Sequence, residues 1–237
     1  MRLLQPGDPV ASLEDLYAVD GAVLRAGFVH TVDGAIAVDG SSEGLSSAAD
    51  KQVFRALRAV CDGVLVGAGT VRAEDYGTVL LSPSGTAWRA ARGLPRPPLV
   101  IVSRSLDLDP DARLFTGDTR PLVLTCAAAT VPAGLADVAD LVVAGQESVD
   151  LLAGIAALRA RGLRHLLCEG GPALLTDLLR LGAVDELCLT SEPLLVGDAP
   201  RLVGGLDEPV RLAAVHLLDG GDGRVLGRYR VLADPPM

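Results

Sequence analysis

The chain has 237 residues, of which 49% are apolar and 3% aromatic, and its formal net charge is −9. Such an apolar content excludes a disordered chain and allows a substantial core of Leu, Val and Ala. The acidic balance argues against nucleic acid or an anionic membrane as the main partner. Because no signal segment is visible and no apolar run reaches the roughly 18 residues that span a bilayer, we expect a cytoplasmic protein.

Short apolar runs alternate with stretches of helical spacing along most of the chain. After an N-terminal lead (residues 1–21) with a short helix at Leu13–Tyr17, strands are expected at Ala22–His30, Gly63–Val66, Leu99–Ser103, Leu122–Thr125, Leu141–Ala144 and Arg164–Cys168. Helices are expected at Ala48–Cys61, Val149–Arg161 and Pro172–Leu181. The Pro- and Gly-rich stretch Ser82–Pro98 is interpreted as a loop or a short helix between loops. This alternation predicts an α/β protein with a mostly parallel, doubly wound sheet.

The last third of the chain changes character. Asp185–Leu189, Arg211–Leu218 and Arg224–Leu232 have no helical partners, and the run 219–223 (Asp-Gly-Gly-Asp-Gly) is typical of a hairpin turn. We therefore expect a C-terminal antiparallel hairpin at the edge of the parallel core. No linker divides the chain, which favours a single domain over residues 1–237 with its core at about 22–232.

Two apolar runs stop abruptly in glycine. The first continues as Gly67-Ala68-Gly69-Thr70-Val71-Arg72, which has two glycines of a Gly-x-Gly-x-x-Gly pattern but an arginine in place of the third. Glycines after a strand let backbone N–H groups approach a phosphate, while Thr70 offers a hydroxyl and Arg72 a charge. The alternative is a tight turn that binds nothing.

A sharper signal follows the last strand of the predicted parallel core. In Glu169-Gly170-Gly171-Pro172, two glycines precede a helix that begins with proline, which leaves free N–H groups at the positive end of a helix dipole. Glu169 is expected to orient this turn or contact a ribose. Ser103 and Arg104, at the end of another strand, are candidates for holding a 2′-phosphate, which would favour NADPH over NADH; a solvated loop is the alternative.

Asp33 and Asp50 are the acidic candidates for catalysis on the substrate side. Asp33 also suits a simple turn before Gly34, and Asp50 also suits a capping box with Ser47. The four cysteines and three histidines show no metal-ligand spacing, so no metal site is expected and the cysteines are interpreted as reduced core thiols.

Taken together, the chain resembles the reductase domain of bacterial riboflavin biosynthesis, a pyrimidine reductase branch of the dihydrofolate-reductase-like fold. The resemblance is carried, in order, by Phe28–Ala37, Gly67–Asp75, Glu169–Leu175, Val184–Leu187 and Glu192–Gly197. It implies a homodimer that uses NADPH to reduce a small molecule. It also implies that Gly67, Gly69, Thr70, Ser103, Arg104, Gly170 and Gly171 lie along the cofactor, with Asp33 beside the nicotinamide and Asp50 near the pterin-binding acid of dihydrofolate reductases.

Two departures from the family pattern bear on the substrate. A Lys-Trp pair usually precedes the Asp50 helix, where this chain has Glu43-Gly44, and an Asp-Pro and a Leu-Thr-Val-Arg run usually follow the Thr70 loop, where this chain has Glu74–Leu81. The missing Lys and Arg would be expected to help hold a substrate phosphate. The resemblance implies reduction of 5-amino-6-(5-phosphoribosylamino)uracil, and a dihydrofolate-type activity on a pterin or a non-catalytic NADPH-binding role stays open.

Overall fold

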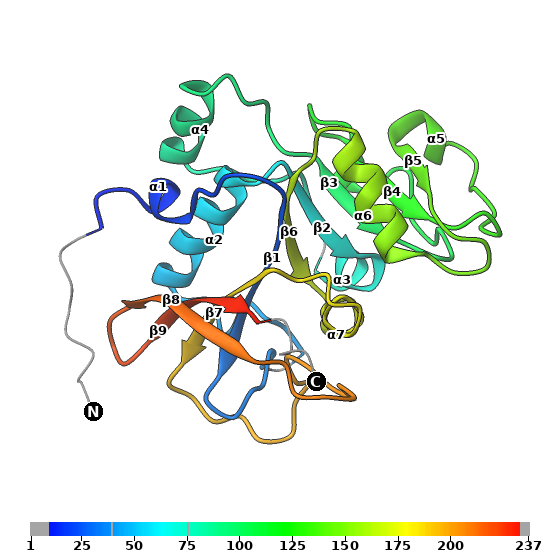
Figure 1. The fold of residues 1–237 in the computed structure, drawn as a ribbon. Coiled ribbons are helices and arrows are strands. Elements are labelled where there is room, and N and C mark those ends of the chain that lie inside the picture. Colours follow the sequence, from blue (N-terminus) through cyan, green and yellow to red (C-terminus); the bar gives the residue numbers. More distant parts are fainter. Residues whose placement is uncertain (1–9, 39, 75, 233–237) are drawn as a thin grey trace.

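The computed structural model describes residues 10–38, 40–74 and 76–232 (Figure 1). Within these residues nine strands form one sheet in the order β5-β4-β3-β2-β6-β1-β7-β9-β8. The strands are β1 (Val23–Thr31), β2 (Gly63–Gly67), β3 (Leu99–Val102), β4 (Leu122–Thr125), β5 (Asp140–Val143), β6 (His165–Gly170), β7 (Glu186–Glu192), β8 (Leu212–Asp219) and β9 (Val225–Val231). The strands β1 to β7 run parallel to one another, as predicted for a doubly wound sheet, and β9 and β8 continue the sheet antiparallel.

The helices connect these strands and cover both faces of the sheet. They are α1 (Leu13–Tyr17), α2 (Ala48–Val60), α3 (Ala68–Ala73), α4 (Pro83–Ala90), α5 (Leu135–Val138), α6 (Leu151–Ala160) and α7 (Pro172–Arg180), with one 3-10 turn, η1 (Arg113–Phe115). Ser47 caps α2 by accepting a hydrogen bond from the Asp50 N–H, and Asp150 caps α6 in the same way. Within the described residues, no helix is long and apolar enough to cross a membrane.

Each strand of the parallel core divides its side chains between two apolar layers. On one face, β2 and β3 side chains pack against Val53 and Leu57 of α2. On the other face, Leu65 and Leu166 pack with Ile155 of α6 and with α7. Figure 1 shows α6 and α7 on the opposite side of the sheet from α2. Because consecutive residues of a strand point to opposite faces, the layer of any strand residue follows from its position.

The prediction for the C-terminal third is confirmed at the hairpin and wrong for its first strand. β8 and β9 pair antiparallel across the glycine-rich turn, as expected. β7 pairs antiparallel with β9 but parallel with β1, so it belongs to the parallel core. The physical reason is that α7 serves as the crossover helix from β6 to β7, a connection that places consecutive strands parallel.

The direction of the chain across the sheet reverses between β2 and β6. From β2 the chain moves outward through β3 and β4 to β5, and it then returns to insert β6 between β2 and β1 before continuing to β7. In open α/β sheets, ligands bind outside the carboxyl ends of the strands at such a switch point. The fold therefore predicts a ligand site at the residues that follow β2 and β6.

Candidate functional site

The two glycine turns predicted from the sequence lie side by side at this switch point. A Cβ atom built on Gly67 would lie 3.6 Å from the Gly171 nitrogen, and one built on Gly171 would lie 2.7 Å from Thr70 Oγ1. Gly170 has φ +132°, a backbone conformation that side chains other than hydrogen rarely permit. Glycine is thus required at position 171 by close approach and at position 170 by backbone geometry, and the turns bring Gly67, Thr70 and Gly171 together.

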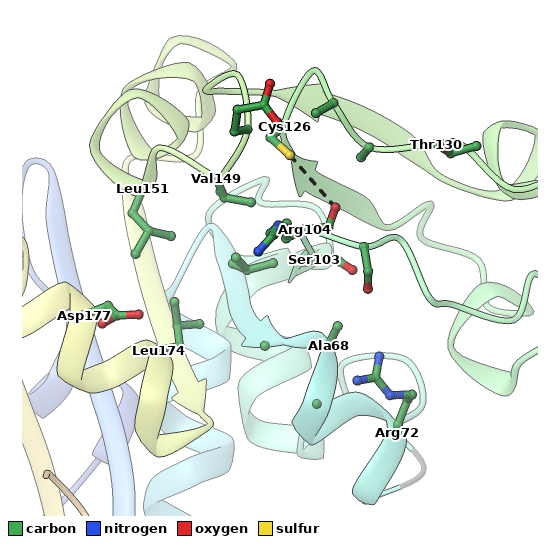
Figure 2. Close-up of a pocket in the computed structure, with 17 residues that line it drawn as sticks. Ala68, Arg72, Ser103, Arg104, Cys126, Thr130, Val149, Leu151, Leu174 and Asp177 are labelled. Atoms are coloured by element: carbon green, nitrogen blue, oxygen red, sulfur yellow. Dashed lines mark hydrogen bonds between the residues drawn. The ribbon is translucent and has the colours of Figure 1, made fainter.

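A large pocket, which we call the glycine pocket, opens at these strand ends (Figure 2). Its volume is about 810 Å3, within the range of small-molecule sites. It is lined by Gly67, Ala68, Gly69, Arg72, Val102, Ser103, Arg104, Ser105, Cys126, Ala128, Ala129, Thr130, Glu147, Val149, Leu151, Leu174 and Asp177. Five residues predicted to bind a cofactor are among them, and Thr70, Gly170 and Gly171 border the same turn.

Polar groups from β3 and α3 face into the glycine pocket. Figure 2 shows Ser103 and Arg104 between Arg72 on one side and Leu174 of α7 on the other. Ser103 is 3% exposed and its hydroxyl accepts a hydrogen bond from the Leu106 N–H at 3.0 Å, which fixes the turn after β3. The Arg104 side chain is exposed and has no hydrogen bond or ion pair with the described residues, whereas Arg72 donates to the Asp107 carbonyl at 2.9 Å.

The amino end of α7 meets the glycine pocket beside Gly171. No side chain caps this nine-residue helix, and Pro172 at its first position has no N–H to satisfy. The remaining free N–H groups and the helix dipole favour an anion here. Together with the exposed guanidinium of Arg104, these features fit the two anionic groups of a phosphorylated dinucleotide, its pyrophosphate and its 2′-phosphate, so the residues present are suited to NADPH.

Glu169 faces away from the glycine pocket. Leu65 of β2 pairs with Cys168 and Val66 pairs with Gly170, so Glu169 is an extra residue in a β-bulge between them. Its side chain lies on the α2 face of the sheet, the face to which Leu167 also contributes. Bulges are frequent beside active sites because they redirect a side chain.

The Glu169 carboxylate is held by two residues that the sequence did not single out. Arg58 of α2 donates from Nε to Oε1 at 2.6 Å and from Nη2 to Oε2 at 2.7 Å, and Tyr76 Oη donates to Oε2 at 2.9 Å. The Glu169 side chain is 1% exposed. Burial and the Glu169 charge raise the pKa of Tyr76 well above its ordinary value, so the phenol stays protonated. A carboxylate offers about four acceptor positions, and these hydrogen bonds use three of them.

A second pocket, which we call the Glu169 pocket, opens on this face. Its volume is about 340 Å3, and it is lined by Arg58, Val64, Glu74, Tyr76, Gly77, Thr78, Val79, Leu80, Leu99, Arg113, Thr116, Gly117 and Glu169. The two pockets share no lining residue. Residues of one turn lie near each of them, since Glu169 lines this pocket and Gly171 lies against Thr70, the residue that follows Gly69 of the glycine pocket.

Asp50 lies outside the linings of both pockets. It is 1% exposed in the first turn of α2, where Oδ2 accepts a hydrogen bond from the Ser46 hydroxyl at 2.9 Å. Oδ1 is buried without a hydrogen-bond partner among the described residues. Burial raises the pKa of Asp50 more than the hydroxyls of Thr190 and Ser46 lower it. Ser47 forms the predicted cap with the Asp50 N–H, whereas the Asp50 carboxylate accepts its hydrogen bond from Ser46. A catalytic role for Asp50 stays a prediction.

Asp33 links the loop that follows β1 to the loop that follows β7 through hydrogen bonds. One carboxylate oxygen accepts the Thr31 hydroxyl, and the other accepts the N–H groups of Val196 at 3.1 Å and Gly197 at 2.8 Å. These hydrogen bonds, first that of Thr31 and then that of Gly197, lower the pKa of Asp33 to about 2. This geometry suits the turn interpretation, and a direct catalytic role for Asp33 stays a prediction.

Arg58 and Tyr76 were not identified as site residues from the sequence, for different reasons. Alternation along β6 places Glu169 on the same face as Leu167, so an available signal pointed to the α2 layer and to Arg58. No local pattern connects Tyr76 to Glu169, because 93 residues separate them. Within the described residues, no group of three or more His, Cys, Asp or Glu side chains is arranged to hold a metal ion.

Comparison with known proteins agrees with this geometry. The family model described as the RibD C-terminal domain matches residues 22–226. A pyrimidine reductase-like protein from Corynebacterium diphtheriae has the same fold with a TM-score of 0.81 and 30% identity, over 90% of this chain and 93% of that one. The predicted dihydrofolate-reductase-like fold and the resemblance to riboflavin-biosynthesis reductases are thereby confirmed.

Curated relatives share a similar level of identity. The 2,5-diamino-6-ribosylamino-4(3H)-pyrimidinone 5′-phosphate reductase of Methanothermobacter thermautotrophicus is 32% identical over 180 residues, 74% of this chain and 80% of that protein. The riboflavin biosynthesis protein RibD of Mycobacterium tuberculosis is 31% identical over 172 residues, 72% of this chain but 42% of that longer protein.

Proposed function

Because this chain belongs to the RibD C-terminal domain family, we propose that it is an NADPH-dependent reductase of riboflavin biosynthesis. Its substrate would be a ribosylaminopyrimidine 5′-phosphate, in the first place 5-amino-6-(5-phosphoribosylamino)uracil, whose ribose it would convert to a ribityl chain. The observation that carries the proposal is the turn at residues 169–171, where Glu169 lines the Glu169 pocket and Gly171 lies against Thr70, next to Gly69 of the glycine pocket. Reduction by a dinucleotide would require cofactor and substrate to come together at this turn, because donor and acceptor carbons must approach to about 3–3.5 Å.

The glycine pocket would hold the cofactor. Gly67, Gly69 and Gly171 leave room for the pyrophosphate, and the free N–H groups of α7 would stabilise its charge. Arg104 and Ser103 would contact the adenosine 2′-phosphate, which accounts for the choice of NADPH rather than NADH. When bound, NADPH supplies a hydride to the C1 carbon of the opened ribose, and the neighbouring nitrogen gains a proton.

Glu169 would act on the substrate side of the same turn. A C=N group accepts hydride most readily when its nitrogen carries a proton and hence a positive charge. The buried carboxylate of Glu169, with one acceptor position free, would stabilise that charge and orient the N–H or a sugar hydroxyl. Arg58 and Tyr76 would hold the carboxylate in position, and the half-buried Tyr76 would limit entry of water.

A dihydrofolate-type activity is the second candidate, and Asp50 is the observation that favours it. A buried carboxylate with an unpaired oxygen and a raised pKa suits recognition and protonation of a pterin ring. Asp50 lies about 12 Å along α2 from Arg58, given the rise of 1.5 Å per residue. A pterin would therefore occupy a place different from the Glu169 pocket.

The decisive experiment follows the loss of NADPH absorbance with purified protein and three substrates offered separately. These are 5-amino-6-(5-phosphoribosylamino)uracil, 2,5-diamino-6-ribosylamino-4(3H)-pyrimidinone 5′-phosphate and dihydrofolate. Oxidation with either pyrimidine, lost in Glu169→Gln and retained in Arg161→Gln, is the expected result. Oxidation with dihydrofolate alone would favour the second candidate, and tight NADPH binding without oxidation would favour a binding protein.

We further propose a homodimer that resides in the cytoplasm. The sheet ends at β8, whose outer edge has no partner strand among the described residues and whose Leu212 and Val215 are 39% and 43% exposed. An unpaired apolar edge of this kind is a frequent site of association. All four cysteines are buried and free, as suits a reducing compartment. Light scattering after gel filtration would measure the oligomeric state.

A further inference from the structure

A serine and a histidine face each other at the carboxyl ends of β1 and β7, and neither lines the glycine pocket or the Glu169 pocket. His30 and Ser191 are directly paired across the two parallel strands, and Ser191 Oγ lies 2.9 Å from His30 Nε2. His30 Nδ1 lies 2.8 Å from the Thr31 carbonyl oxygen. Both side chains are half-buried, so each keeps some access to solvent. A hydroxyl, an imidazole and a carbonyl are thus connected in series.

The contact with Thr31 determines which nitrogen of His30 carries the proton. A carbonyl oxygen only accepts hydrogen bonds, so Nδ1 is the protonated nitrogen of the neutral ring. Nε2 is then the acceptor, and the Ser191 hydroxyl donates to it. This is the tautomer in which an imidazole can take the proton of an attacking hydroxyl. In serine proteases an aspartate holds the histidine in this form, and here the Thr31 carbonyl does so.

The surrounding hydrogen bonds hold this pair in place. The Thr31 carbonyl also accepts the Gly34 N–H at 2.8 Å, and the Thr31 side chain is buried. Asp33 accepts the Thr31 hydroxyl with one oxygen and two N–H groups of the loop after β7 with the other. Asp33 therefore links the end of the strand that carries His30 to the end of the strand that carries Ser191. Reactive groups on strands that are fixed in this way keep their geometry without a substrate.

The loops that follow the pair expose apolar side chains. They are joined by a hydrogen bond from the Val32 N–H to the Leu194 carbonyl at 3.1 Å. Val32 and Leu195 are 68% and 72% exposed, and Leu194 is 45% exposed. Exposed apolar side chains that gather at one strand end provide contact area for an apolar ligand. The chemistry next to the pair therefore suits an uncharged group rather than a phosphate or a carboxylate.

We infer that Ser191 is a nucleophile, activated by His30, that hydrolyses small carboxylic esters with an apolar acyl group. Ser191 Oγ forms a bond to the ester carbonyl carbon while its proton passes to His30 Nε2. The C–O bond to the alcohol then breaks, and the alcohol leaves with that proton. Water attacks the acyl carbon and gives a proton to Nε2. The bond from the acyl carbon to Oγ breaks, Oγ takes the proton, and the carboxylic acid leaves. This activity goes beyond the proposed function and requires no NADPH.

The test follows hydrolysis of p-nitrophenyl acetate and p-nitrophenyl hexanoate by the wild type, Ser191→Ala, His30→Gln and the control Ser148→Ala. Ser148 is an exposed serine of the loop after β5 that lines neither pocket. We expect Ser191→Ala and His30→Gln each to lower kcat/KM by about 100-fold, the lower end of what a positioned general base contributes. Ser148→Ala should match the wild type. The hexanoate should have the lower KM, because its acyl chain is larger and apolar.

Covalent labelling tests the same inference in the unaltered protein. A fluorophosphonate should modify the wild type at Ser191, as peptide mass spectrometry would show, and should react far more slowly with His30→Gln. Equal ester hydrolysis by the wild type and Ser191→Ala would overturn the inference, and so would a wild type that is not labelled at Ser191. If either variant fails to fold, as its melting curve would show, labelling of the wild type decides alone.

Discussion

Arg58 and Glu169 join helix α2 to the end of strand β6 through a bidentate ion pair, with N···O distances of 2.6 Å and 2.7 Å. The carboxylate is buried and the guanidinium is partly accessible. The Glu169 charge raises the pKa of Arg58 further above its ordinary value, so the arginine is always protonated. The pair therefore fixes a buried negative charge in the wall of the Glu169 pocket, where a carboxylate without a partner would be costly.

Breaking this pair from one side should destabilise the protein more than removing it from both sides. Glu169→Gln leaves the Arg58 charge without its carboxylate, and we expect a loss of about 3 kcal/mol in the free energy of unfolding. Arg58→Gln should have a similar effect. The double variant should lose clearly less than the sum of the two, because no uncompensated charge then remains. Urea unfolding of the four proteins measures these values, and simple additivity would show that the pair is not coupled.

Arg104 should decide which nicotinamide cofactor is preferred. Its side chain lines the glycine pocket and has no ion pair with the described residues. We expect Arg104→Gln to weaken NADPH binding about 10- to 100-fold, since it removes charge-assisted hydrogen bonds to a phosphate. Binding of NADH should change little. Fluorescence titration with both cofactors provides the measurement, and equal weakening for the two would place Arg104 elsewhere along the dinucleotide.

Much of this architecture could be predicted from local patterns. The apolar runs that became β2 and β6 stop in glycine where the chain turns, and at Gly171 a side chain would collide with Thr70. The helix over Ala48–Val60 begins at Ser47, as its cap predicts. Short α3 is not predicted from the sequence, because its six residues, Gly69 among them, are too few to show helical periodicity.

Contacts between distant segments could not be predicted in this way. Tyr76 meets Glu169, and Arg113 meets Gly77, only after the sheet has placed separate loops side by side. Even within the motif of residues 169–171, the local pattern does not predict where the Glu169 side chain lies. Its neighbours Gly170 and Gly171 behave as the motif suggests, but the bulge and the alternation of β6 direct its carboxylate to the opposite layer.

Glu186 should make the stability of the protein sensitive to acid. Its carboxylate accepts hydrogen bonds from the buried Arg25 at 2.6 Å and from Arg228 at 2.7 Å. Burial raises the pKa of Glu186, but the hydrogen bonds and charges of Arg228 and Arg25 together lower it below its ordinary value of 4.5. The stabilisation is therefore present above pH 4.5 and is lost as the pH falls through the lowered folded-state pKa.

Replacing Glu186 by glutamine should lower the free energy of unfolding by about 3 kcal/mol at neutral pH, because the charges of Arg25 and Arg228 would lose their shared carboxylate partner. The deficit relative to the wild type should shrink at acidic pH, where the wild type also loses the charge. Thermal unfolding of both proteins across the acidic range tests this expectation. A deficit that is the same at every pH would mean that packing, rather than charge, accounts for the loss.

Asp50 should show the opposite dependence on pH. Its folded-state pKa is raised above the ordinary value of 3.8, mainly by burial, so the folded protein binds a proton more tightly than the unfolded chain. The contribution of Asp50 to stability is then greatest below pH 3.8 and falls as the pH rises toward the folded-state pKa. Asp50→Asn removes this loss, and we expect the variant to be more stable than the wild type at neutral pH, with the difference vanishing in acid.

The same substitution tests whether the unpaired oxygen of Asp50 serves chemistry. A destabilising buried carboxylate is a feature of functional sites, where stability is exchanged for activity. Asp50→Asn should therefore bind NADPH as the wild type does while its turnover of the active substrate falls by about 100- to 10,000-fold, the range of one general acid or base. Calorimetric binding of NADPH and steady-state turnover give the two values. A variant that is more stable and fully active would show that Asp50 plays no part in catalysis.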